Sequence, residues 1–534
     1  MRHKVILLIL LLISIFQARA QFDSLEYHAK LYGALGTEGY APHWIESNRY
    51  GILNDSIQDL LIIPGFTYPL KFGKHFKIST GLDIAIKRNL DESFIYQGYA
   101  NFSYGKLKLI AGIQEYTLGQ YSEYLSSGSF LVSNNAQPIP RIGIGFYDYV
   151  DIPFTKGYLQ VKGALNHGWL ENERLGHSEL NKPLLHEKFA YIRTQKIPIN
   201  PYVGISHFAL YGGEDKNSEK IGIDYWAVFK GQASNVPGIA GEGINAAGEH
   251  LGVFDFGFYS RIKNYDITFY YQFPVTDRTG KESKFSRNMD FFTGLLLETK
   301  QKNIINGFLY EFIHTLQQGG LGIPDPIVDG RLIVLWREED KAFLKEYYTN
   351  LGYPVDDLDT EIEWRSFLQA YTNYGYLFGG RVDFYNNLLY RHIYKGRVIG
   401  TPLFQTMPEL NRMAGFQDSI TYIVNNRIFA HHIGISGYVH KNLDYRLMLT
   451  YTRNKGAWQE YGGRYQWNGI AIDPDYDWFW KGDLTQWYTL LEANYVIPGY
   501  DKLSVKTAVA FDFGDLDKNF GILIGISFQD FIKF

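Results

Sequence analysis

Apolar and polar positions alternate strictly at the end of the chain. One face of an extended strand there would carry Phe520, Ile522, Ile524, Ile526 and Phe528, whereas small or polar residues fall on the other. The stretch 503–513 repeats this period of two, which predicts two strands with one apolar face each. An apolar strand face packs either against the core of a soluble protein or against membrane lipid. The final residue, Phe534, is aromatic, as in many bacterial outer-membrane barrels.

Similar alternation recurs along the chain as a series of hairpins. Tight turns, for example at Gly105-Lys106 and at Lys263-Asn264, separate neighbouring strands. The other predicted strands are 72–86, 93–104, 107–113, 154–165, 201–210, 222–230, 251–262, 265–273, 291–299, 304–315, 428–439, 443–452 and 485–497.

The connections between these strands alternate in length, which predicts a topology. With Phe534 at the periplasmic end, 498–502 and 440–442 are short inner turns. The segments 454–484 and about 401–427 are then long outer loops. Short turns on one side and long loops on the other are typical of outer-membrane barrels and have no reason to arise in a soluble sandwich.

The length of the apolar runs narrows the fold further. Beyond residue 20 no stretch reaches the roughly 18 consecutive apolar residues of a membrane helix, so a membrane protein of this sequence must be a closed barrel. About 514 residues allow roughly 16 to 20 strands. A descending strand is missing between residues 317 and 387, where 338–351 looks helical instead. We therefore expect an all-β, closed antiparallel transmembrane barrel with some short helices in loops or in a plug.

The first 20 residues have the pattern of a signal peptide. A basic start precedes an apolar run from Val5 to Phe16, and Ala18-Arg19-Ala20 has the form of a cleavage site. The expected mature chain, 21–534, is then the barrel with its lumen and rim segments. Cysteine is absent, which excludes disulfides and a lipidated N-terminal cysteine, and export of such a chain indicates the bacterial envelope. A formal net charge of -4 gives no reason to expect nucleic acid as a partner.

Motifs for catalysis or metal binding are missing. His186-Glu187 begins like a zinc-protease helix, but residue 190 is Ala190, and His431-His432 would point to opposite faces of a strand. No Gly-x-Ser-x-Gly and no phosphate-binding loop occurs, although a site assembled across strands would leave no such motif. The sequence thus predicts no enzyme, no metal and no cofactor.

The outer loop 454–484 is rich in aromatic rings beside charged groups. Rings can stack on the C–H faces of sugars while polar groups take the hydroxyls, although an aromatic girdle or loop packing would use the same residues. The candidate ligand-binding residues are Trp458, Tyr461, Arg464, Trp467, Asp475, Trp478 and Trp480.

Several blocks of sequence spread over most of the chain form a recognisable pattern. They are 127–129 with 134–140, 185–189, 204–207 with 211–213, 248–252, 310–312 with Thr315, 383–387 with 400–403, and 425–427 with 431–432. In their order and spread these blocks resemble the Wzi-type capsule-assembly outer-membrane proteins, in their Bacteroidetes-like branch. The resemblance implies an outer-membrane barrel of about eighteen strands that binds surface polysaccharide as a lectin and supports capsule or exopolysaccharide assembly. The pattern departs from the family between 318 and 380, where this chain carries a longer insert.

Two of these blocks also predict features of the barrel lumen. The segment 134–140, with two prolines, is expected to be a rigid non-strand segment in the lumen or over a barrel mouth. His186, Glu187 and Lys188 are candidates for a charge cluster in the lumen.

The expected partners are capsular or exported polysaccharide and outer-membrane lipid, in the bacterial outer membrane. A channel for saccharides or other small solutes is the alternative function, and an outer-membrane enzyme acting on lipid or glycan is a third.

Overall fold

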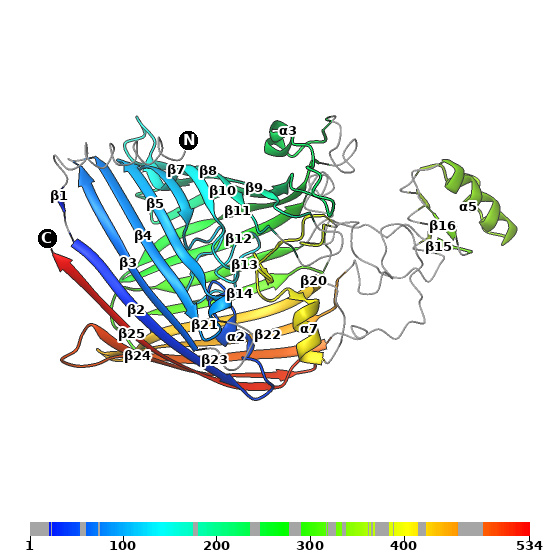
Figure 1. The fold of residues 1–534 in the computed structure, drawn as a ribbon. Coiled ribbons are helices and arrows are strands. Elements are labelled where there is room, and N and C mark those ends of the chain that lie inside the picture. Colours follow the sequence, from blue (N-terminus) through cyan, green and yellow to red (C-terminus); the bar gives the residue numbers. More distant parts are fainter. Residues whose placement is uncertain are drawn as a thin grey trace.

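The protein is a closed antiparallel β-barrel of 18 strands (Figure 1). The computed structural model describes residues 21–22, 24–53, 60–72, 75–172, 174, 180–234, 236, 246–276, 290–316, 318, 327–329, 331–333, 338–360, 363–364, 367–368, 384–387, 389–414, 423–457 and 484–533.

Each barrel strand pairs with its neighbour along the chain. The strands are β2 (Ser24–Gly36), β3 (Leu60–Phe72), β4 (Phe76–Lys87), β5 (Phe94–Tyr104), β6 (Leu107–Ile113), β7 (Arg141–Asp151), β8 (Leu159–Trp169), β9 (Leu184–Thr194), β10 (Ile199–Tyr211), β11 (Glu249–Ile262), β12 (Tyr265–Thr276), β13 (Phe291–Glu298), β14 (Gly307–His314), β21 (Ile428–His440), β22 (Leu443–Asn454), β23 (Leu484–Val496), β24 (Leu503–Gly514) and β25 (Asn519–Lys533).

Shorter elements occupy the connections. They are β1 (Gln21–Phe22), α2 (His43–Glu46), a 3-10 turn (Leu90–Glu92), α3 (Tyr225–Lys230), β15 (Ile327–Val328), β16 (Arg331–Leu332), α5 (Glu338–Asn350), β17 (Ile393–Tyr394), β18 (Arg397–Val398), β19 (Gln405–Thr406), α7 (Met407–Ala414) and β20 (Ile423–Asn425). The helix expected at 338–351 is therefore confirmed as α5, which packs Leu344 and Tyr348 into a small core of its own with Trp364.

The first and last long strands close the barrel. β2 pairs antiparallel with β25 along its whole length, from Ser24 opposite Lys533 to Gly36 opposite Gly521. No edge is left between them, so every strand finds a partner on both sides, as a membrane requires. The closed barrel that the sequence predicted is confirmed.

The apolar face of the strands points away from the lumen. In β25 the side chains of Ile522, Ile524 and Ile526 are exposed, whereas Leu523 between them is fully buried. The same outward apolar face appears on β10 and on β24. An exposed hydrocarbon face around a closed barrel is stable only in lipid, which places the protein in the outer membrane. No helix among the described residues has the length and apolarity of a membrane-spanning segment.

The missing descending strand is not needed. β14 pairs directly with β21, from Gly307 opposite Ser436 to His314 opposite Phe429, so the segment between them adds no barrel strand in its described part. β14 runs toward the long-loop end and β21 runs back from it. The two strands are therefore antiparallel, like every other pair of neighbouring strands in the barrel.

One predicted strand is wrong and four barrel strands were not predicted. Residues 225–230 of the expected strand 222–230 form α3, because the Asp224 side chain caps the Ala227 N–H and Gly231 ends the helix in the left-handed region. The unpredicted strands are β2, β3, β7 and β9. In β9 the outer face carries His186 and Lys188, which α3 covers, so the alternation is lost.

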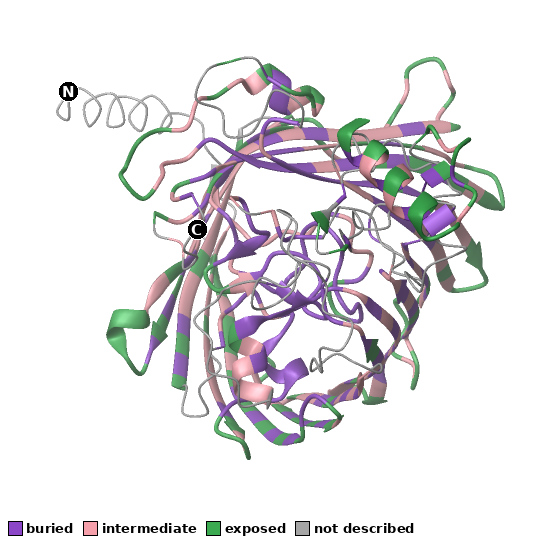
Figure 2. Cartoon of the chain, turned by 90° about the vertical axis from the view of Figure 1, so that its right-hand side faces the viewer, coloured by how far each residue is buried: buried purple, intermediate pink, exposed green. Residues whose placement is uncertain are grey.

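The long connections fold back into the lumen. Figure 2 looks onto the long-loop end and shows buried segments inside the ring of strands. These segments come from the β2–β3, β6–β7 and β14–β21 connections; we call them together the plug. The expectation of a lumen segment at 134–140 is confirmed, since Ala136 and Ile139 are part of the buried core.

The prediction of an outer loop at 401–427 is wrong for its described residues. Phe404 and Ile423 are fully buried in the core of the plug, and α7 and β20 belong to the same segment. The apolar side chains of this stretch need burial, and the lumen is the interior in which they find it. The expected loop at 454–484 does begin and end at strand ends, Asn454 of β22 and Leu484 of β23.

Candidate functional site

A buried carboxylate on the barrel wall holds the plug. Glu311 of β14 points into the lumen and accepts hydrogen bonds from the Ser126 hydroxyl, from the Ser127 hydroxyl and from the Ser127 backbone N–H, each 2.7 Å long. The Tyr270 hydroxyl of β12 donates to the same carboxylate. Hydrogen bonds to a charged acceptor in a buried site are among the strongest in proteins, so Glu311 fixes this part of the plug against the wall.

A histidine and a threonine of the wall form a second anchor. His432 Nε2 donates to the Leu125 carbonyl over 2.7 Å, so its Nδ1 is left to accept from the Thr450 hydroxyl, also at 2.7 Å. The Trp44 indole N–H in turn donates to Thr450 Oγ1 over 3.1 Å. His432 thus faces the lumen, whereas its neighbour His431 stacks on Phe312 on the outer face, as the strand period predicts.

Apolar packing fills the space between these anchors. The largest fully buried side chains include Trp44, Phe130 and Phe404 of the plug and Tyr488 of β23. Phe130 contacts Phe292 of the wall at a ring-centroid distance of 5.7 Å and Phe384 of the plug at 4.9 Å. The plug and the inner wall therefore share one hydrophobic core, and this part of the lumen is packed like a protein interior.

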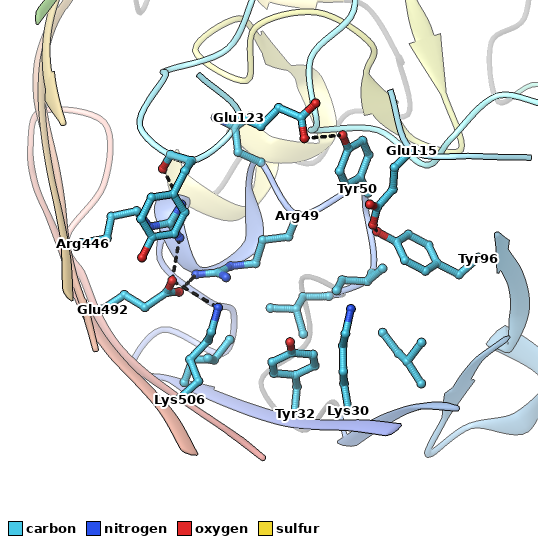
Figure 3. A pocket seen from close by; sticks show the side chains of 16 residues that line it. Lys30, Tyr32, Arg49, Tyr50, Tyr96, Glu115, Glu123, Arg446, Glu492 and Lys506 are labelled. Atoms are coloured by element: carbon cyan, nitrogen blue, oxygen red, sulfur yellow. Dashed lines mark hydrogen bonds and ion pairs between the residues drawn. The ribbon is translucent and has the colours of Figure 1, made fainter. Parts of the chain in front are cut away.

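A cavity of about 200 Å³ remains between the plug and the wall (Figure 3). Its walls come from β2, β3, β5, β22, β23, β24 and β25 and from the plug segments that carry Arg49 and Tyr124. The lining residues are Lys30, Tyr32, Asn48, Arg49, Tyr50, Ile52, Leu53, Ile63, Tyr96, Glu115, Glu123, Tyr124, Arg446, Glu492, Lys506 and Leu523.

Three basic side chains converge on one carboxylate in this cavity. Arg49 Nη2 lies 2.7 Å from Glu492, Arg446 Nη2 lies 3.2 Å from it, and Lys506 Nζ lies 3.4 Å from it. Glu492 is 1% exposed, so the pairs are held in a largely desolvated site. Arg49 comes from the plug and the other two from β22 and β24, so this cluster also joins plug and wall.

Tyrosines and carboxylates form the other side of the cavity. The Tyr50 hydroxyl donates to Glu123 over 3.3 Å, and the Tyr96 hydroxyl donates to Glu115. Burial raises the pKa of Glu115 and raises the pKa of Tyr124 to about 12, so the latter stays a neutral phenol at any physiological pH. Aromatic rings beside hydrogen-bonding charged groups can take the faces and the hydroxyls of a sugar ring.

The site residues that the sequence predicted in the segment 454–484 stay a prediction. Trp458, Tyr461, Arg464, Trp467, Asp475, Trp478 and Trp480 fall outside the described residues. The expected lumen cluster at 186–188 is divided: Glu187 faces the lumen and accepts from Asn166, whereas His186 and Lys188 lie on the outer face under α3. No group of three metal-ligating side chains with suitable geometry occurs in the described part of the chain.

Sequence reasoning missed the cavity because its residues are far apart in the chain. Lys30, Arg49, Arg446, Glu492 and Lys506 lie on strands and loops that no local motif connects. One signal was available: charged side chains at inward positions of a packed lumen must pair, because burying an unpaired charge is costly. Aligning those positions at equal distances from the short turns would have brought Arg446, Glu492 and Lys506 together.

Acidification is expected to loosen the plug through its buried histidines. Burial lowers the pKa of His43 and of His392 to about 3, so both are neutral in the folded plug. The pKa of a histidine in an unfolded chain is about 6.5, so on acidification the unfolded plug binds protons before the folded plug does. The free energy of unfolding of the plug therefore falls as the pH drops below that value. Between pH 7 and pH 5 the wild type should lose about 2 kcal/mol more than the variant His392→Gln. Denaturant titrations of both proteins at the two pH values measure this difference; equal losses would contradict it.

The fold and the plug define an outer-membrane β-barrel with a filled lumen. Residues 65–320, nearly half of the chain, match the family model for the capsule assembly protein Wzi. A comparison with curated proteins gives no match. The sequence similarity is therefore to the Wzi family, over the part of the barrel from β3 to the end of β14 and just beyond.

Solved outer-membrane barrels are similar over nearly the whole length. Wzi of Escherichia coli, an outer-membrane protein involved in group 1 capsule assembly and a carbohydrate-binding β-barrel, is 11% identical, with 95% of this chain and 84% of that chain covered and a TM-score of 0.48. OccAB4 of Acinetobacter baumannii is 9% identical, with 96% and 99% covered and a TM-score of 0.44. OprD of Pseudomonas aeruginosa is 10% identical, with 97% and 98% covered and a TM-score of 0.43.

Proposed function

We propose that this barrel binds surface polysaccharide and supports the assembly or attachment of a capsule or exopolysaccharide. The observation that carries the proposal is the match of residues 65–320 to the capsule assembly family, in a barrel whose lumen is filled by its own loops. The blocks that resemble the Bacteroidetes-like branch, among them 248–252 and 425–427, support placing the chain there. Residues 1–20 would be removed on export, and 21–534 would form the mature protein.

A binding role fits the architecture better than transport or catalysis. A channel for saccharides needs a continuous aqueous path, and the apolar contacts of Phe130 with the wall and with Phe384 lie across the lumen. Lipid contacts the exposed apolar face of the strands, so the partners of this protein would be lipid around it and glycan at its ends. Binding without bond cleavage needs neither a metal nor a cofactor.

The rim loop between β22 and β23 is the candidate contact with polysaccharide outside the cell. We expect the double replacement of Trp478 and Trp480 by alanine to reduce the amount of polysaccharide retained on the cell surface, because two stacking rings are lost. The barrel should still assemble, since β22 and β23 pair through residues outside this loop. Quantifying cell-bound against released polysaccharide in the two strains tests this.

The matched control is an aromatic residue at the opposite end. Tyr500 is 70% exposed in the short turn between β23 and β24, so Tyr500→Ala should leave retention unchanged. Normal retention of polysaccharide by the double variant would remove the loop from the proposal. If the purified wild-type protein bound none of the isolated polysaccharides tested, the proposal itself would be overturned.

A further inference from the structure

Four basic side chains and three carboxylates line the cavity in the lumen, so its formal charge is positive by one, and most of the positive charge lies around Glu492. Arg49, Arg446 and Lys506 share the single carboxylate of Glu492, so three positive charges face one negative charge. Lys30 of β2, which β25 separates from β24, adds a fourth cation and points into the same space (Figure 3). No carboxylate within the described residues lies in ion-pair reach of Lys30, and Glu115 acts on it only at longer range.

The two carboxylates on the far side of the cavity accept hydrogen bonds from tyrosine hydroxyls and form no ion pair with the basic side chains around Glu492. Glu115 accepts from the Tyr96 hydroxyl and Glu123 from the Tyr50 hydroxyl. Figure 3 shows Arg49, Arg446 and Lys506 around Glu492 on one side of the cavity and Tyr50 and Tyr96 on the other, with Tyr32 and Lys30 between the two sides. A ligand that fits both walls has an anionic group at one end and hydroxyl groups with an apolar face at the other.

The volume suits a single sugar ring. An engineered protein cavity of about 150 Å³ binds benzene, and this one, at about 200 Å³, has room for a six-membered ring with substituents. The side chain of Lys506 is 24% exposed and Lys30 is half-buried, so solvent reaches the basic wall.

The cavity lies toward the short-turn end of the barrel. Arg446 and Lys506 are three residues from the start of their strands and Glu492 is four from the end of its strand, which is roughly 10 Å along a strand. Short turns face the periplasm in outer-membrane barrels, so this site lies on the periplasmic side of the plug.

The same chemistry continues around the short-turn half of the lumen. Lys162 Nζ of β8 lies 4.5 Å from the centre of the Tyr191 ring, and the Arg193 guanidinium of β9 lies 3.9 Å from the centre of the Tyr149 ring. These cations are held against tyrosine rings by cation–π contacts. The basic and aromatic lining is therefore not confined to the cavity.

We propose that the short-turn half of the lumen binds an acidic sugar unit, with the carboxylate of a uronic acid residue received by Lys30, Arg49 and Lys506. This inference rests on the proposed polysaccharide function and deepens it by naming the substrate class and a second contact, on the periplasmic side. The rings of Tyr50 and Tyr96 on the opposite wall take the ring face, and the plug separates this contact from the rim.

The test uses the purified full-length barrel in detergent, where both ends are accessible. The probes are a disaccharide of glucose and glucuronic acid and the corresponding neutral disaccharide of glucose, titrated by calorimetry. We expect the acidic probe to bind more tightly and its affinity to fall with rising salt, because the contact is charged. Lys30→Met should raise the Kd of the acidic probe about tenfold. Lys106→Met, which removes an exposed lysine of the β5–β6 turn, should not change it.

A second variant separates the proposal from damage to the fold. Glu115→Gln keeps an acceptor for Tyr96 but removes a negative charge from the far wall, so it should lower the Kd of the acidic probe about threefold. Opposite shifts in the two variants support the site. Equal Kd values in wild type and Lys30→Met, weaker binding in both variants, or equally tight binding of inorganic phosphate each overturn it.

These outcomes are distinguishable from failure of the proposed function. Wild type that binds whole polysaccharide while the acidic disaccharide binds independently of Lys30 would contradict this inference alone. Wild type that binds no polysaccharide and neither disaccharide would overturn both.

Discussion

Replacing Glu311 by alanine should release the β6–β7 segment of the plug from the wall. The Ser126 hydroxyl and both donors of Ser127 lose their shared acceptor in a buried site, and Tyr270 loses its partner as well. Hydrogen bonds to charged groups contribute about 1.5–3 kcal/mol each and are not additive, so we expect a loss of at least about 3 kcal/mol for local opening. The Ser127 amide, which donates to Glu311 directly, should then exchange its hydrogen about a hundredfold faster.

Hydrogen–deuterium exchange read by mass spectrometry on peptides that cover 126–136 measures this effect. The control is Glu26→Ala, which removes an exposed glutamate near the short-turn end of β2 and should leave those peptides protected. Equal protection in Glu311→Ala and wild type would mean that the plug is held without this carboxylate.

Replacing Trp44 by alanine should destabilise the packed lumen most strongly among apolar changes. Trp44 is 1% exposed, its indole N–H donates to Thr450, and its ring lies 5.5 Å from that of His432. Truncating a fully buried tryptophan costs about 3–5 kcal/mol, because the transfer free energy is lost and a cavity remains. The apparent melting temperature, followed by near-ultraviolet circular dichroism of the packed aromatic rings, should fall by several degrees.

Trp226→Ala is the matched control for this change. Trp226 of α3 is 65% exposed, so its loss removes a ring of the same kind without opening a cavity. If Trp44→Ala and Trp226→Ala both had the melting temperature of wild type, Trp44 would not lie in a packed core.

The barrel wall could be predicted from sequence because lipid imposes a simple rule on it. In β25 and β24 every second side chain faces hydrocarbon, so the alternation of Ile522, Leu523 and Ile524 is visible without any knowledge of the partners. The rule fails where lipid does not contact the strand. β9 was missed because α3 covers His186 and Lys188 on its outer face, and polar residues are tolerated there.

The plug could not be predicted in the same way because its contacts have no period. Phe404 and Trp44 are buried by segments from three different connections, and a buried irregular loop has the same composition as a long outer loop. The segment 401–427 was therefore assigned to the outside by its length alone. Its two pairs of apolar residues, Leu403-Phe404 and Ile423-Val424, were the signal that this segment packs into a hydrophobic core.

The residues that line the cavity could not be grouped from the sequence. Arg49 and Glu492 are brought together by the path of the β2–β3 connection into the lumen, which depends on the whole barrel having closed. The sequence prediction was directed to the aromatic residues of the segment 454–484, which lie close together along the chain. A site whose members lie on β2, β22, β23 and β24 becomes visible only once the register of those strands is known.

Planar-bilayer recording of the wild-type protein tests the filled lumen most directly. A barrel whose plug shares one hydrophobic core with the wall should insert without a stable open-channel current, and Glu311→Ala should show current steps under the same conditions. A steady ohmic conductance from the wild type would contradict the account, because ions would then be crossing the space that Trp44, Phe130 and Phe404 are described as filling.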